Sequence, residues 1–161
     1  MTVRTVDMHH PEWPMIRDQL PKLAHRVALA TEVKTGIAPS PARIKRSLDL
    51  ACLGHEDNFV LVTAGPCLVG YNIGQPWWGD MVALSEEFVV RYKPGNFADT
   101  IKDLEQHAQA LGCTALVISS LAMVRQESYG NYLKRKGFRE VSREYMKGLN
   151  DGENHRIYHR R

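Results

Sequence analysis

The sequence has few cysteines and no long apolar run. Its three cysteines, Cys52, Cys67 and Cys113, lie far apart, so neither a disulfide framework nor a cysteine-rich zinc site is expected. No apolar stretch approaches the roughly 20 residues that a membrane-spanning helix needs. The first residues, MTVRTVDMHHPEWP, also lack the apolar core of a signal peptide. These absences argue against an integral membrane protein and predict a cytoplasmic location.

Other motifs with a defined chemistry are absent as well. The chain contains no Gly-x-x-x-x-Gly-Lys-Ser/Thr loop, which argues against a nucleotide site of the P-loop type. Its histidines form no metal-ligand pattern, so no metal site is expected. The formal net charge of +3 permits an anionic ligand without requiring nucleic acid. Basic clusters at 43–46 and 134–136 are typical of solvated surfaces, which leaves nucleic-acid binding as a minor alternative.

A length of 161 residues with 43% hydrophobic residues indicates one folded domain, assigned to residues 1–150, and a polar basic tail at 151–161. The first third is expected to be helical after a short strand. One segment with apolar residues at helical spacing contains Pro21, which is expected to kink or split the helix. A second helix is expected from Ser40, a capping residue followed by proline, to Gly54.

The remaining pattern predicts a mixed sheet. Two apolar runs joined by Ala-Gly-Pro predict a hairpin over 58–78, and the run at 81–92 adds a third antiparallel strand. A helix over 96–112 and an apolar strand at 113–122 complete a parallel strand–helix–strand unit. A short basic helix follows, and FREVSREYMKGL then closes the fold as a last strand or hairpin. The predicted class is α/β (α+β), a mixed central sheet of about six or seven strands flanked by about four helices.

This order, with four local features, resembles the GNAT superfamily of acyl-CoA N-acyltransferases over about residues 4–149. Two helices follow the first strand, and a meander then ends in MVALSEEFVVR. The helix ADTIKDLEQHAQALG ends in glycine directly before the strand TALVIS. YLKRKGFREVSREYMKGL is similar to the family's tyrosine-rich helix, Lys-x-Gly-Phe turn and closing strand. The resemblance implies transfer of an acetyl group from acetyl-CoA to a primary amine, and the chain also looks like small bacteriophage GNAT-like proteins.

The resemblance implies that coenzyme A binds at the segment RYKPGNFAD. The family holds the cofactor diphosphate with backbone amides of a loop, Arg/Gln-x-x-Gly-x-Gly/Ala, that leads into a helix N-terminus. Here Phe97 stands where the family has the last glycine or alanine, and the charges of Arg91 and Lys93 would compensate. The implied cofactor-binding residues are Val89, Val90, Arg91, Lys93, Gly95, Asn96, Phe97 and Ala98.

The implied reaction needs a base for the amine and a proton donor for the leaving thiolate. Several family members keep a base on the strand that here carries Glu86 and Glu87. Adjacent strand residues face opposite sides, so one of the two points into the site; Glu87 lies nearer the expected cofactor end, but alternation does not decide. The family's tyrosine position is Leu133 here. Tyr132 is therefore the candidate acid, and packing as a core aromatic is the alternative.

Three more residues are candidates for substrate contact. Trp77 and Trp78 lie side by side in the loop QPWWGD, where they would wall an acceptor pocket or anchor a partner. Ser119, at the end of TALVISS, is a polar candidate near the thioester. The acceptor would be an amine-bearing small molecule or a protein, and an open sheet edge would allow a homodimer.

The sequence thus supports two hypotheses. In the first, the protein is a GNAT-type N-acetyltransferase whose amine substrate attacks acetyl-CoA directly in a ternary complex. In the second, it is a catalytically degenerate protein of the same fold, with a binding or structural role such as a virion-associated one. The positions of Phe97 and Tyr132 favour the second hypothesis, and the fold alone does not decide between them.

Overall fold

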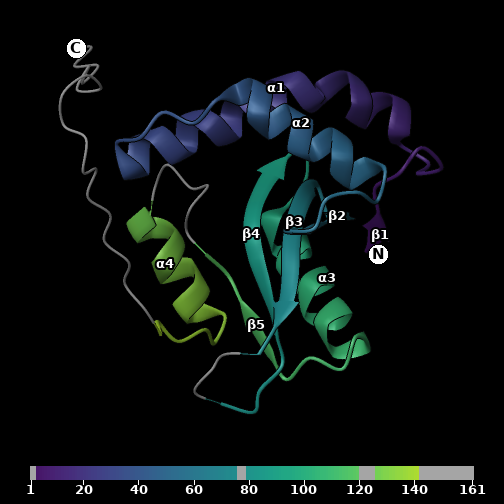
Figure 1. Cartoon of the computed structure of the whole chain (residues 1–161). Helices are drawn as coiled ribbons and strands as arrows, with labels where there is room; N and C mark the ends of the chain where they lie inside the picture. Colours follow the sequence, from purple (N-terminus) through teal and green to yellow (C-terminus); the bar gives the residue numbers. More distant parts are fainter. Residues whose placement is uncertain (1–2, 76–78, 120–125, 142–161) are drawn as a thin grey trace.

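A computed structural model of the chain describes residues 3–75, 79–119 and 126–141, which form a mixed sheet with helices on both faces (Figure 1). The described strands are β1 (Arg4–Thr5), β2 (Val60–Ala64), β3 (Cys67–Gly74), β4 (Ala83–Arg91) and β5 (Ala115–Val117). The described helices are α1 (Trp13–Thr35), α2 (Pro41–Cys52), α3 (Phe97–Ala110) and α4 (Gln126–Arg135). Their succession along the chain confirms the predicted fold class.

The sheet has the order β1-β2-β3-β4-β5. The first four strands pair antiparallel as a meander, and β5 pairs parallel to β4. Because α3 connects these two parallel strands, the predicted strand–helix–strand unit is confirmed. The described residues hold five strands, fewer than expected. Residues 138–141 of the predicted last strand are not in a strand, and the rest of that segment lies outside the described residues.

The first helix, α1, runs through Pro21 as one helix of 23 residues. The helix is not split there, because its packing against the sheet outweighs the one hydrogen bond that proline does not donate. Ile16, Leu20 and Leu23 recur at helical spacing and are buried in the core beneath the helix. The helix ends at Gly36, whose φ of 68° is the left-handed conformation of a C-cap.

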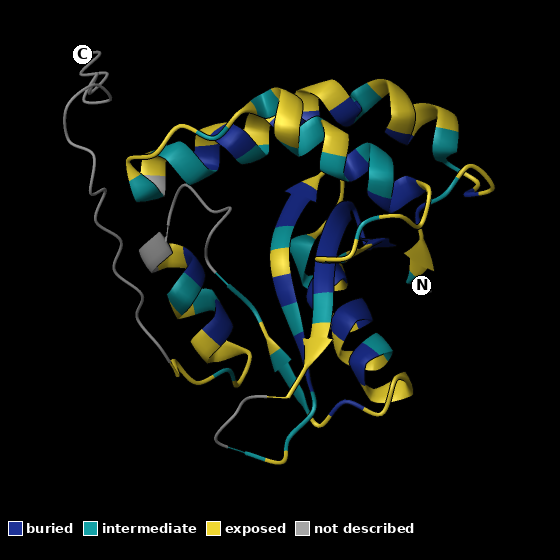
Figure 2. Cartoon of the chain, viewed as in Figure 1, coloured by how far each residue is buried: buried dark blue, intermediate teal, exposed yellow. Residues whose placement is uncertain are grey.

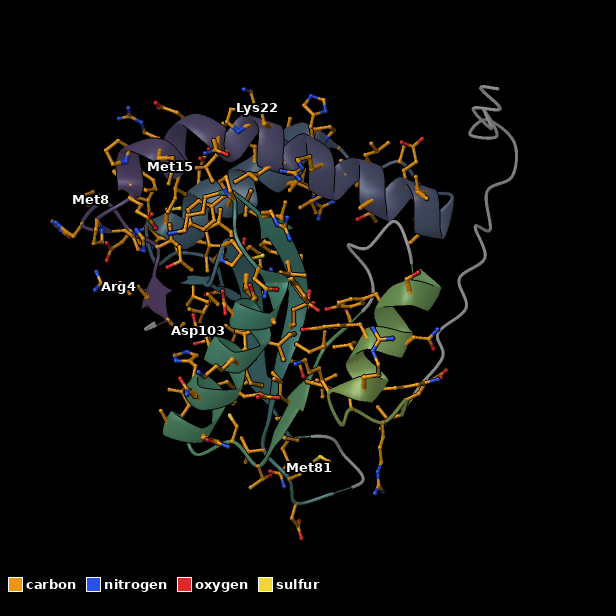
Figure 3. The ribbon with its side chains drawn as sticks, turned by 180° about the vertical axis from the view of Figure 1, so that it is seen from behind. Arg4, Met8, Met15, Lys22, Met81 and Asp103 are labelled. Carbon is orange, nitrogen blue, oxygen red and sulfur yellow. The ribbon has the colours of Figure 1, made fainter. Side chains whose placement is uncertain are left out.

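Two buried polar residues attach α3 to the turn between β2 and β3. The carboxylate of Asp103, labelled in Figure 3, accepts a hydrogen bond from Gly65 N at 2.9 Å. Thr100 Oγ1 donates to Ala64 O at 3.0 Å. These contacts fix the direction of α3 and therefore the position of its N-terminus relative to the end of β4.

Hydrophobic clusters cover both faces of the sheet. The cluster beneath α1 and α2 includes Leu20, Leu48 and Leu68, and the cluster beneath α3 includes Val69 and Leu104. Figure 2 shows the buried residues gathered on the central strands and on the sides of the helices that face them. Within the described residues, no helix combines the length and the hydropathy needed to cross a membrane.

Candidate functional site

The parallel strands β4 and β5 separate partway along β4. Their pairing covers Ala83, Leu84 and Ser85, whereas β4 continues to Arg91. Beyond the last pair, β3 bonds one edge of β4, and no described strand lies along the other edge. This edge of β4 therefore presents backbone N–H and C=O groups that a ligand can bind.

A β-bulge lies where the two strands separate. In the register of β3 and β4, Phe88 lies opposite Gly70 and Glu86 lies opposite Tyr71. Glu87 is therefore the additional residue on β4. A bulge bends its strand and redirects the side chains beyond it, so this position decides which candidate base faces which side of the sheet.

Glu86 lies at the point where β4 and β5 separate, the divergence of the two strands. Its side chain shares a face of β4 with Leu84, which belongs to the cluster beneath α3. The residue is 4% exposed, and Oε2 accepts a hydrogen bond from Ser119 N at 2.8 Å. The carboxylate thus links β4 to the chain just beyond β5, and it brings together two residues that the sequence singled out.

Glu87 faces the other side of the sheet. It is exposed and accepts a hydrogen bond from Asn72 Nδ2. Asn72 shares its face of β3 with Leu68, which packs beneath α1 and α2. The two glutamates therefore point in opposite directions, one into the divergence of β4 and β5 and one toward the α1–α2 side.

Two tyrosines of α4 approach the divergence. The ring centroid of Phe97 lies 5.5 Å from that of Tyr129 and 6.2 Å from that of Tyr132. Both tyrosine hydroxyls are buried, and neither has a hydrogen-bond partner among the described residues. Burial is the main cause that raises the pKa of Tyr129, and the nearby Glu86 carboxylate adds to it. The hydroxyl therefore stays protonated and can donate a hydrogen bond. A buried donor without an acceptor is rare in folded proteins, so each hydroxyl requires a partner that the described residues do not supply.

The amino group of Lys93 is bound by a carboxylate from the start of α1. Its Nζ lies 2.7 Å from Glu12 Oε1 and 3.0 Å from Oε2. The hydroxyl of Tyr92 donates to Glu12 Oε2 at 2.5 Å. Hydrogen bonds from Lys93 and Tyr92 lower the pKa of Glu12. The lysine that was expected to offset a phosphate charge is therefore held in a contact that joins β4 to α1.

Two guanidinium groups lie near the end of β4. Arg26 Nη1 donates to Arg91 O at 2.9 Å, and the side chain of Arg91 is exposed. Burial raises the pKa of the Cys67 thiol, and nearby Thr100, Arg91 and Arg26 counteract this rise. Both arginines therefore lie close to one position at this end of the strand. Arg26 could not be recognised from the sequence, because 65 residues separate it from its contact on β4.

The loop before α3 has a tightly packed glycine. Gly95 has a φ of 157°, and a Cβ placed on it would lie 2.7 Å from Pro66 Cβ. Asn96 then caps α3, because its Oδ1 accepts from Ala98 N at 3.0 Å. Among the described residues, no group accepts a hydrogen bond from the N–H of Asn96 or of Phe97. The helix start thus keeps two backbone donors available although Ala98 N is occupied.

The bulky side chain of Phe97, which stands where the family has glycine or alanine, does not crowd the loop. Its side chain is half-buried and packs against the cluster of Ile101 and the tyrosines of α4. Val89 and Val90 bury their side chains in the two clusters on opposite faces, so only their backbone can contact a ligand. Trp77 and Trp78 lie outside the described residues.

A pocket with a volume of about 510 Å³ lies on the α1–α2 side of the sheet. It is bounded by α1, by the start of α2 and by Phe88, the neighbour of Glu87 on β4. Nothing in the sequence indicated it, because its residues come from segments that are not consecutive. The uncovered edge of β4 and the pocket therefore lie on different sides of the strand, and the bulge lies between them.

No family model and no curated protein sequence matches the chain. Its structure is similar to that of a "probable acetyltransferase" at a TM-score of 0.58, with 13% identity over 94% of this chain and 99% of the other. It is also similar to an aminoglycoside acetyltransferase from an uncultured soil metagenomic sample, at a TM-score of 0.52, with 15% identity over 91% and 97%. A GNAT family acetyltransferase of Staphylococcus aureus gives a TM-score of 0.50, with 17% identity over 92% and 100%. At these identities the similarity shows the fold, which is that of acetyltransferases.

Proposed function

We propose that the protein is an N-acetyltransferase that transfers an acetyl group from acetyl-CoA to a primary amine by direct attack in a ternary complex. The observation that carries this proposal is the edge of β4 that no described strand covers, placed between the N-terminus of α3 and two buried tyrosine hydroxyls. Solved acetyltransferases of the same fold support it.

The backbone of β4 fits the arm of coenzyme A, which contains amide groups. Val89 and Val90 would hold this arm through backbone hydrogen bonds, since their side chains are buried. Backbone hydrogen bonds do not depend on which side chains the strand carries, so this mode of binding is compatible with a sequence that differs from those of other acetyltransferases.

The start of α3 fits the diphosphate of the cofactor. The N–H groups of Asn96 and Phe97 and the positive end of the helix dipole favour an anion there. Arg91, with Arg26 beside it, supplies positive charge. Asp99 in the first turn opposes the anion, so we expect binding in the micromolar range rather than tighter.

Acetyl-CoA would supply a thioester whose C–S bond breaks as the C–N bond to the amine forms. Glu87 takes the proton of the amine, because its exposed carboxylate lies on the α1–α2 side of the sheet, from which an amine can approach a thioester held at the edge of β4. Tyr129 or Tyr132 donates a hydrogen bond that stabilises the departing sulfur. Glu86 positions the backbone of Ser119 at the divergence.

Calorimetric titration of the purified protein with acetyl-CoA tests the cofactor site. We expect micromolar binding that Arg91→Ala weakens about tenfold, since one charge-assisted contact is lost. Arg17→Ala removes the same charge from an exposed position on α1 and should leave the affinity unchanged. Absence of binding at millimolar acetyl-CoA would refute the acetyltransferase proposal.

Acetylation assays with substituted glutamates test the base. Glu87→Gln should lower kcat by a factor of about 100 while acetyl-CoA still binds. Glu86→Gln retains an oxygen that can accept from Ser119 N, so its turnover should fall much less. Equal losses in the two variants would contradict the assignment of Glu87.

The second candidate is a protein of this fold that binds a partner without catalysis. The ion pair between Lys93 and Glu12 favours it, because the pair withdraws an expected phosphate contact. In this case acetyl-CoA does not bind, and neither glutamate substitution affects the protein's role.

A further inference from the structure

The pocket on the α1–α2 side of the sheet has mainly apolar walls. Its volume of about 510 Å³ is typical of sites for small molecules. The apolar side chains in its lining include those of Val27, Ile44, Leu48, Phe59 and Phe88. A ligand that fills it must therefore contain an apolar body, because a fully hydrated polar molecule would lose its water contacts there.

One wall of the pocket is an aromatic pair of fixed geometry. Phe59 and Phe88 meet edge to face, with centroids 5.2 Å apart and planes at 84°. Phe88 also lies directly over Gly70, where any added Cβ would overlap its ring. The ring is therefore held between its partner and the sheet, and its position suits the flat face of an aromatic or branched aliphatic group.

Arg43 is the charged side chain in the lining of the pocket. It is exposed, and in the described part of the chain no carboxylate forms an ion pair with it. It stands in the first turn of α2, which contains no acidic residue. The guanidinium and the helix N-terminus together make this end of the pocket favourable for an anion. Of the two lining serines, Ser47 is hydrogen-bonded to the Glu56 carboxylate.

The pocket and the proposed base lie on the same side of the sheet. Glu87 directly precedes Phe88, so its Cα is about 3.8 Å from that of a lining residue. Its carboxylate is fixed by Asn72 on this same face. An amine bound beside Phe88 would lie near the base, and Arg43 on α2 lines the same pocket.

We propose that this pocket binds the acceptor, and that the acceptor is a small primary amine with an apolar, preferably aromatic, body and a carboxylate or phosphate that pairs with Arg43. This proposal rests on the proposed function, because it assigns the substrate class of the same reaction. It disfavours polycationic amines, which Arg43 and the N-terminus of α2 would repel.

Direct binding of matched probes to the full chain tests this proposal without turnover. Phenylalanine carries all three features, 2-phenylethylamine lacks the carboxylate, glycine lacks the apolar body, and the phosphonate analogue of phenylalanine replaces the carboxylate. We expect phenylalanine or its phosphonate to bind about tenfold or more tightly than the other two. The stronger of the two anionic probes identifies the anion.

Arg43→Ala should reduce the affinity for the anionic probe to that for 2-phenylethylamine, and Arg43→Lys should restore part of it. Arg46→Ala, an exposed substitution of equal charge on α2, serves as the matched control and should have no effect. Equal binding of all probes, or an anionic preference that survives Arg43→Ala, would overturn the proposal. Separate titration with acetyl-CoA, which Arg43→Ala should not alter, shows whether the proposed function itself holds.

Discussion

Removal of the Glu12 charge should destabilise the protein and loosen the start of the proposed cofactor loop. Glu12 receives hydrogen bonds from Tyr92 and Lys93 at 2.5–3.0 Å, and the Lys93 and Glu12 side chains are 27% and 34% exposed. Hydrogen bonds to a charged group contribute about 1.5–3 kcal/mol, whereas exposed ion pairs contribute about 0–1 kcal/mol. For this half-buried group, Glu12→Gln should lower the free energy of unfolding by about 1–2 kcal/mol.

The effect of Glu12→Gln should depend on pH. The contacts with Lys93 and Tyr92 lower the pKa of Glu12 below its ordinary value of 4.5. Because the folded pKa lies below the unfolded one, the stabilisation is present above about pH 4.5 and is lost as pH falls through the folded value. The difference in stability between the native protein and the variant should therefore decrease at acidic pH.

Urea unfolding in a series of buffers from neutral to acidic pH measures this difference. Asp18→Asn is the control, because Asp18 pairs with Arg17 at 3.2 Å on the exposed surface and should contribute less than about 0.5 kcal/mol. A loss that is the same at every pH would contradict the ionic account of the contact. A loss as small as that of the control would contradict the stabilising role of the contact.

Three further predictions follow from buried groups. Tyr129→Phe removes a buried hydroxyl that has no partner among the described residues, so stability should stay equal or rise by up to about 1 kcal/mol in urea unfolding; acetylation should fall in this variant or in Tyr132→Phe, whichever hydroxyl contacts the departing sulfur. Burial lowers the pKa of His10, so its contribution to stability is present above about pH 6.5 and is lost as pH falls further; thermal unfolding of His10→Gln should show a weaker decline over this range. Gly70→Ala should displace Phe88 into the pocket, which weakens aromatic probe binding in calorimetry without affecting acetyl-CoA.

Local features of the sequence predicted most of the fold. Ser40 followed by proline marks the start of α2, and its Oγ accepts from Arg43 N at 3.3 Å as a helix cap does. The Ala-Gly-Pro turn joins β2 and β3, with Gly65 at a φ of 52°. These signals depend only on the conformational preferences of a few adjacent residues, so they can be recognised from the sequence alone.

The features that define the candidate site depend on distant contacts. From the sequence alone, the strand that contains Glu86 and Glu87 is expected to alternate regularly. The bulge at Glu87 arises only from the pairing of β4 with β3. The ion pair of Lys93 with Glu12 joins residues 81 positions apart. Lys93 lies in a loop that resembles a phosphate site. The sequence of this loop does not indicate that the carboxylate of Glu12 binds the lysine.

The replacement of a loop glycine by Phe97 has a different meaning in the folded protein than in the sequence. As a sequence feature it suggests a phosphate loop that has lost its function. In the structure the ring turns toward α4 and packs between α3 and the tyrosines of that helix. The N–H of Phe97 remains available at the helix start, since binding through a backbone donor depends on the direction of the side chain and not on its size. The same residue thus holds Tyr129 and Tyr132 near the divergence of β4 and β5, which makes the departure from the family pattern compatible with catalysis.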